Sequence, residues 1–109
     1  MSSVITLLTD YGVGTQHVGV MHGVLARECP GADRIDLVHD IPPGDVRWGA
    51  VLLRRLVPEL PGAVHIAVVD PGVGTTRRAI AMQLDDGSRV VGPDNGLLGL
   101  LVPLAANAV

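Results

Sequence analysis

Short apolar runs alternate along this chain with longer segments in which hydrophobic residues recur every three or four positions. The short runs, some with a period of two, predict β-strands. The expected strands cover residues 4–8, 34–38, 64–69, 79–84 and 89–91. The helical spacing predicts helices over residues 15–28 and from Asp45, a good N-cap, to Val57, and the leucine-rich segment 97–104 predicts a third helix.

The order of these elements predicts an α/β fold: a mainly parallel sheet with flanking helices, Rossmann-like and three-layered, which includes a β-hairpin with its turn at residues 85–88. In a parallel sheet the carboxyl ends of the strands meet at one edge, where open α/β sheets bind ligands. We therefore expect the loops at Asp10, His39-Asp40 and Asp70 to lie together. The loop at Asp94-Asn95 also follows a strand, but the pattern leaves the direction of that strand open.

Composition narrows the function classes. Hydrophobic residues make up 48% of the 109 residues, yet Tyr11 and Trp48 are the only aromatics besides histidine, so the core must be aliphatic. The net charge of −3 argues against nucleic-acid binding, and the single cysteine excludes an internal disulfide. All eight basic residues are arginine, which excludes lysine chemistry. With neither a basic leader nor an apolar run of membrane-spanning length, we expect a cytoplasmic protein without a membrane partner.

The segment from Asp70 to Arg77 is the strongest candidate for chemistry. Its glycines and proline make it conformationally unusual, and its amides, with Thr75 and Thr76, could hold an anion or a polar ligand. An aspartate held near an arginine stays ionised and can position a water or a hydroxyl. The alternative is an ordinary tight turn with a surface ion pair.

Asp10 has two interpretations as well. It could be a carboxylate that binds a vicinal diol, or a turn residue that accepts backbone hydrogen bonds, and Asp94-Asn95-Gly96 has the same ambiguity. The four histidines are scattered, and a structural role is favoured for each. His39-Asp40 suggests a metal ligand or a base, but no second ligand stands at a suitable spacing, so we predict no metal site.

Five motifs occur in order and together resemble one enzyme family, the S-adenosylmethionine hydroxide adenosyltransferases, whose relatives include fluorinases and chlorinases. The resemblance extends over almost the whole chain. The motifs are Thr9-Asp10-Tyr11-Gly12, Val18-Gly19-Val20-Met21, His39-Asp40-Ile41-Pro42-Pro43, Val68-Val69-Asp70-Pro71-Gly72-Val73-Gly74 and Gly92-Pro93-Asp94-Asn95-Gly96-Leu97-Leu98.

The resemblance implies a function and a set of site residues. Hydrolytic members split S-adenosylmethionine into adenosine and methionine without a cofactor, by attack of water or hydroxide on the ribose 5′ carbon. By motif, Asp70 and Arg77 match the catalytic pair, and Asp10 matches the carboxylate that holds the ribose hydroxyls. The loop of Asp94 and Asn95 lies close to the family's site. Tyr11 and Thr75, within the matched loops, complete the expected substrate-binding set.

The resemblance also implies what the chain lacks. Residues 1–109 correspond to part of an N-terminal α/β domain, without the family's small C-terminal β-barrel domain and its later catalytic histidine. Family members are typically trimers whose substrate lies between subunits. We therefore expect a homotrimer for the full-length form, but little turnover by these 109 residues, and self-association through an exposed sheet edge and apolar face.

Three alternatives remain. The chain could be a non-catalytic module that binds adenosine or only oligomerises. It could be a metal-dependent phosphohydrolase that uses Asp10, His39 and Asp40. It could be a halogenase, although halide-using relatives do not have aspartate at the position of Asp70, whose presence favours water as the nucleophile.

Overall fold

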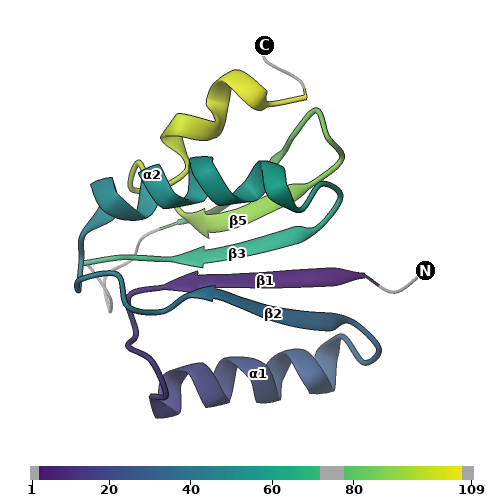
Figure 1. The fold of residues 1–109 in the computed structure, drawn as a ribbon, viewed down its shortest axis with the longest axis vertical. Coiled ribbons are helices and arrows are strands. Elements are labelled where there is room, and N and C mark those ends of the chain that lie inside the picture. Colours follow the sequence, from purple (N-terminus) through teal and green to yellow (C-terminus); the bar gives the residue numbers. More distant parts are fainter. Residues whose placement is uncertain (1–2, 72–77, 107–109) are drawn as a thin grey trace.

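A computed structural model describes residues 3–71 and 78–106, and within them five strands form one sheet in the order β2-β1-β3-β5-β4 (Figure 1). The strands are β1 (Val4–Thr9), β2 (Asp33–Val38), β3 (Val64–Val68), β4 (Ala79–Gln83) and β5 (Arg89–Pro93). The helices are α1 (Gln16–Glu28) and α2 (Val46–Leu56), with two 3-10 helices, η1 (Val57–Glu59) and η2 (Gly99–Leu104).

The sheet is parallel except at one edge. The pairs β1–β2, β1–β3 and β3–β5 are parallel, whereas β4 runs antiparallel to β5 and forms the predicted hairpin with it. The prediction of a mainly parallel α/β fold is therefore confirmed. Because β5 is parallel to β3, the direction that the sequence left open is also known: the loop after β5 lies at the same edge as the loops after β1 and β3.

Helix α2 covers one face of the sheet. The helix begins where expected, because the Asp45 carboxylate accepts a hydrogen bond from the Trp48 amide at 3.0 Å. Its apolar side buries Ala50 and Leu53, while Arg54 remains exposed. The buried core on this face also includes Leu8, Ala67, Val69, Val90, Leu97, Leu98 and Leu101.

The leucine-rich segment differs from the expected helix. Residues Gly99–Leu104 form a 3-10 helix with Pro103 inside it. Proline supplies no backbone N–H and disfavours the α conformation of the residue before it, so a regular α-helix through this position is strongly disfavoured. The segment still contributes Leu101, which is fully buried against α2.

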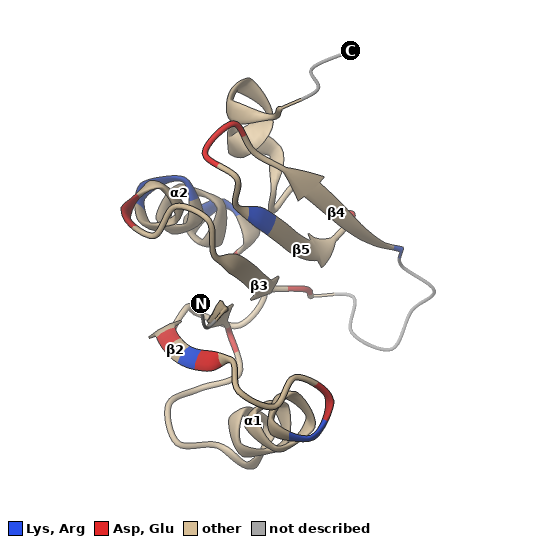
Figure 2. Ribbon diagram, turned by 90° about the vertical axis from the view of Figure 1, so that its right-hand side faces the viewer, with Lys and Arg blue, Asp and Glu red and all other residues tan. Residues whose placement is uncertain are grey.

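Helix α1 lies on the opposite face and covers only part of it. Met21 and Leu25 lie beside Ile66 of β3, and Val18 is the one buried residue of the helix. Figure 2 shows α1 beside β2, well apart from β4, so the same face of β5 and β4 has no helix over it within the described residues. The molecule therefore has the three predicted layers, with one of them incomplete.

Candidate functional site

The carboxyl edge of the sheet brings four loops together. The Asp10 amide donates to the Val68 carbonyl at 3.2 Å, which ties the end of β1 to the end of β3. The Gly12 amide donates to the His39 carbonyl at 2.7 Å, which ties the loop after β1 to the loop after β2. The loops at Asp10, His39 and Asp70 thus meet at one edge, as the element order predicted, and the parallel pairing of β5 with β3 adds the loop at Asp94.

Asp10 faces the loop that leads into α2. Its Oδ2 accepts a hydrogen bond from the Gly44 amide at 2.7 Å. Gly44 has a positive φ of 75°, and a Cβ there would lie 3.0 Å from the Cβ of Pro71, the residue after Asp70. Only glycine fits this turn without strain. Asp10 and the residues around Asp70 are therefore held on two sides of one closely packed turn.

Asp70 lies two residues beyond the end of β3 and is half-buried. Its expected partner Arg77, together with Thr75, lies outside the described residues.

Asp94 and Asn95 bond to their own surroundings. The Asn95 side-chain amide donates to the Val69 carbonyl at 2.9 Å, and its Oδ1 accepts from the Leu97 amide at 3.1 Å. Asp94 is exposed and pairs with the Arg78 guanidinium at 2.7 Å. Asn95 thus fixes the backbone immediately before Asp70, and a hydrogen bond connects the loop after β5 to the loop after β3.

Tyr11 lies half-buried beside Asp10. Its ring centroid is 5.5 Å from that of His17 on α1. Burial, and then the negative charge of Asp10, raise the pKa of the Tyr11 hydroxyl above its ordinary value. The phenol is therefore neutral at physiological pH and offers both a donor and an acceptor at the edge.

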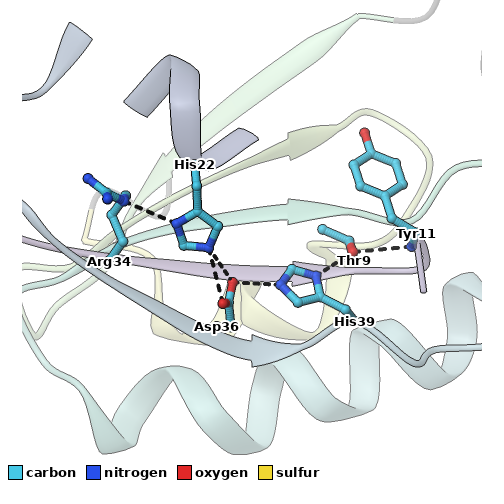
Figure 3. A network of polar contacts seen from close by, with 6 residues as sticks. All are labelled: Thr9, Tyr11, His22, Arg34, Asp36 and His39. Atoms are coloured by element: carbon cyan, nitrogen blue, oxygen red, sulfur yellow. Dashed lines mark hydrogen bonds and ion pairs between the residues drawn. The ribbon is translucent and has the colours of Figure 1, made fainter. Parts of the chain in front are cut away.

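A polar network that the sequence analysis missed lies behind this loop (Figure 3). Asp36 of β2 accepts from His22 Nε2 at 2.9 Å and lies 2.6 Å from His39 Nε2. The other nitrogen of His39 lies 2.7 Å from the Thr9 hydroxyl, which accepts the Tyr11 amide at 3.1 Å. Arg34 donates to His22 Nδ1 at 3.0 Å.

The carboxylate of Asp36 is the centre of this network. Partial burial acts to raise its pKa, but the hydrogen bonds from His39 and His22 outweigh burial and hold the pKa below the usual 3.8. One signal in the sequence was available: Arg34 and Asp36 alternate on one face of a strand that is only half apolar. The position of α1 on the sheet decides which helical residue Arg34 and Asp36 contact. The spacing of residues in the sequence does not predict that position.

His65, one of the four histidines for which a structural role was favoured, lies in the core. It is fully buried near the start of β3, away from the carboxyl edge, and its Nδ1 lies 2.7 Å from the Thr6 hydroxyl. Burial lowers the pKa of the ring, although the Leu60 carbonyl and the Asp86 charge oppose this effect.

The described residues give little support to a metal site. No three His, Cys, Asp or Glu side chains among them are grouped so as to hold an ion. Both ring nitrogens of His39 are already in hydrogen bonds, and the Asp10 carboxylate accepts a hydrogen bond from the Gly44 amide.

Among the residues that the structure describes, no helix has the length and apolar character needed to cross a membrane.

Comparison with known proteins defines the class. Residues 5–109 match the family described as the SAM hydroxide adenosyltransferase N-terminal domain. The match covers nearly all of the chain, and the chain belongs to this family.

Individual relatives sharpen this result. The chain is 60% identical over 94 residues to an (R)-S-adenosyl-L-methionine hydrolase from Salinispora arenicola, covering 86% of this chain and 36% of that protein. It is 47% identical over 97 residues to a hydrolase of the same name from Thermus thermophilus, and the alignment covers 88% of this chain and 37% of that protein. A fluorinase from Nocardia brasiliensis is more distant: it is 33% identical over 89 residues, which cover 79% of this chain and 29% of the fluorinase.

A solved structure has the same fold. A conserved hypothetical protein from Thermus thermophilus superposes with a TM-score of 0.84 at 47% identity, covering 97% of this chain and 44% of that one. In sequence, the chain spans just over a third of the length of the two curated hydrolases named above.

Proposed function

We propose that the whole protein hydrolyses S-adenosyl-L-methionine to adenosine and L-methionine. The observation that supports this most strongly is the 60% identity, over 94 residues, to a protein named as this hydrolase. The lower identity to a fluorinase, 33%, and the aspartate at position 70 favour water over halide as the nucleophile.

The chemistry suits a site with few catalytic groups. Attack on the ribose 5′ carbon releases methionine as a neutral thioether, so no general acid is needed. The protein must place an oxygen nucleophile in line behind that carbon and keep bulk water away. In this proposal Asp70, with Arg77, orients the attacking water, and Asp10 holds the ribose diol. Tyr11, Thr75, Asp94 and Asn95 complete the substrate pocket, and no cofactor takes part.

Further proposals concern the whole protein. We propose that it also contains a small C-terminal β-barrel domain, assembles as a homotrimer and acts in the cytoplasm. Support comes from the family, since the matched segment covers only 36% of a named hydrolase. Sedimentation of the full-length protein measures the assembly, and a monomer would overturn the trimer.

The test of activity uses the full-length protein and S-adenosyl-L-methionine in water enriched in oxygen-18. We expect adenosine that carries the label at its 5′ hydroxyl, with an equal amount of methionine. Asp70→Asn should lower kcat by about a hundredfold or more, because it removes the group that orients the nucleophile. The 109-residue chain, assayed alongside, should show little turnover.

Two results would contradict the proposal. Absence of adenosine from the full-length protein would exclude the hydrolase. Consumption that required added chloride or fluoride would indicate a halogenase instead.

The second candidate is a non-catalytic module that binds adenosine or only assembles. The share of the relatives that this chain spans, just over a third, favours it for the 109 residues taken alone. Calorimetric titration with adenosine separates the two forms of this candidate: heat of binding supports a ligand module, and its absence supports a purely structural one.

A further inference from the structure

One residue outside the matched catalytic set holds the loop of Asp10 and Tyr11 by two routes. The His39 carbonyl accepts the Gly12 amide at 2.7 Å. The His39 ring lies 2.7 Å from the Thr9 hydroxyl, and that hydroxyl accepts the Tyr11 amide at 3.1 Å. The backbone on either side of the Tyr11 side chain is therefore fixed by a single residue of a different strand connection.

The hydrogen positions in this chain of contacts follow from the Asp36 carboxylate, which can only accept a hydrogen bond. The contact of 2.6 Å therefore places a hydrogen on His39 Nε2, which donates to Asp36. The Thr9 oxygen accepts the Tyr11 N–H and has a hydrogen of its own, which it can donate to Nδ1 of His39. This arrangement satisfies the Tyr11 amide, the Thr9 hydroxyl and both ring nitrogens of His39.

The second histidine reaches the same carboxylate in the same form. Arg34 donates to His22 Nδ1, so His22 also carries its hydrogen on Nε2 and points it at Asp36. Both carboxylate oxygens lie within 3.1 Å of His22 Nε2. Asp36 therefore receives two imidazole donors, one from α1 and one from the loop after β2, which fixes the orientation of the His39 ring (Figure 3).

Burial makes these contacts consequential. Thr9 is fully buried and His39 is 7% exposed. A buried hydroxyl that loses its acceptor either remains unsatisfied, at a cost of about 1–3 kcal/mol, or rotates away. Rotation of Thr9 about χ1 would withdraw its oxygen from the Tyr11 amide. The loop that presents Asp10 would then lose one of its attachments.

We propose that His39, oriented by Asp36 and His22, is a positioning residue that holds the Asp10–Tyr11 loop in its ligand-binding conformation. The inference rests on the proposed function for its consequence in catalysis. Its structural part stands on the contacts alone. It assigns no contact with substrate to His39.

The two ring nitrogens can be tested separately. Asparagine places an amide at the position of Nδ1, and glutamine places one at the position of Nε2. His39→Asn therefore keeps the contact with Thr9 and loses Asp36, whereas His39→Gln keeps Asp36 and loses Thr9. His39→Ala removes both. Val57→Ala serves as the control, because Val57 is fully buried at the C-terminal end of α2 and takes no part in the hydrogen bonds of this network.

The first measurement needs no ligand. Amide hydrogen exchange of the full-length protein, followed at Tyr11 and Gly12, reports the loop directly. We expect His39→Ala and His39→Gln to lower the protection of the Tyr11 amide by about tenfold, the loss of one hydrogen bond, and His39→Asn to retain most of it. Val57→Ala, compared at equal distance below its melting temperature, should leave Tyr11 protection relative to the core amides unchanged.

The second measurement connects the loop to the ligand. Adenosine affinity by calorimetry should fall by about tenfold in His39→Ala and His39→Gln, with a matching rise in KM for S-adenosyl-L-methionine and a smaller change in kcat. His39→Asn should restore the affinity. A merely structural role would predict that Val57→Ala has the same effect.

The outcomes distinguish the two proposals. Unchanged Tyr11 exchange and unchanged adenosine affinity in His39→Ala would overturn the positioning role. If the unmodified full-length protein neither binds adenosine nor consumes S-adenosyl-L-methionine, the proposed function fails, and the exchange of Tyr11 in the three variants still decides whether His39 holds the loop.

Discussion

At the scale of single residues, the buried histidines show how one side chain type takes different roles. His39 and His65 are both buried, and each has one ring nitrogen beside a threonine hydroxyl. The second ring nitrogen of His39 bonds to the Asp36 carboxylate. His65 has no carboxylate bonded to its ring among the described contacts, and burial lowers the pKa of that ring. The charged form of His65 is therefore the less stable one in the folded protein.

This gives a prediction for the pH dependence of stability. The ring of His65 has a lower pKa when folded than its ordinary 6.5, so the unfolded chain binds more protons as the pH falls below about 6.5. The stability that neutral His65 contributes is present above that pH and is lost as the pH falls toward the folded pKa. Urea unfolding between pH 7.5 and 5 should show a decline in unfolding free energy.

The control for this prediction is His65→Asn, which keeps a polar group beside Thr6 and cannot titrate. Its unfolding free energy should be lower at pH 7.5 but should change less between pH 7.5 and 5. An equally steep decline in the variant would show that His65 is not the source of the pH dependence.

At the scale of elements, hydrophobic spacing predicted most of the fold, because each strand and helix buries one face. The expected strand over residues 64–69 is β3, and the hairpin after it is formed by β4 and β5. Hydrophobic spacing predicted the wrong element at residues 99–104, where Pro103 disfavours an α-helix and the chain forms the 3-10 helix η2. It also could not predict contacts between elements: His22 and Asp36 meet only because α1 packs beside β2.

The site was predictable to the same degree and for the same reason. Strand ends gather in a parallel sheet, so the meeting of the loops at Asp10, His39 and Asp70 followed from element order. The roles within those loops did not follow. Asn95 bonds to the Val69 carbonyl across 26 residues, and nothing local in Asp94-Asn95-Gly96 distinguishes that contact from an ordinary turn.

The contact between α2 and the sheet gives a prediction at this scale. A Cβ at Gly49 would lie 2.9 Å from Leu97 Cδ1 and 3.2 Å from Val69 Cγ2. Gly49→Ala should therefore destabilise the protein by about 1–2 kcal/mol, since overpacking outweighs the gain in helix propensity. Chemical denaturation measures the difference.

Helix α1 provides the matched control. A Cβ at Gly23 meets nothing within 4 Å, so Gly23→Ala should stabilise the protein by about 0.5–1 kcal/mol through helix propensity alone. The same substitution is thus expected to have opposite signs in the two helices. Equal effects would show that α2 does not pack closely on Val69 and Leu97.

At the scale of the whole molecule, the two faces of the sheet are covered unequally. The core lies under α2 and η2, where Leu53, Ala67 and Leu97 are fully buried. On the other face Val64 and Ile66 are only half-buried, and Ala79 and Ala81 of β4 are exposed. Helix α1 adds exposed Val20 and Val24 along the same side. An apolar surface of this kind, next to the edge strand β4, favours association.

We therefore expect the 109-residue chain to self-associate through this face as its concentration rises. Val24→Glu or Ala81→Glu should raise the concentration of half-association by about tenfold, because each places a charge on the apolar surface, at a cost of about 1.4 kcal/mol. Val102→Glu is the matched control, since Val102 is 52% exposed on η2, over the opposite face. Sedimentation over a dilution series measures all three. If Val102→Glu weakened association as much as Val24→Glu, the contact would involve α2 and η2 rather than the incompletely covered face of the sheet. A chain that remained monomeric throughout the dilution series would contradict the prediction altogether.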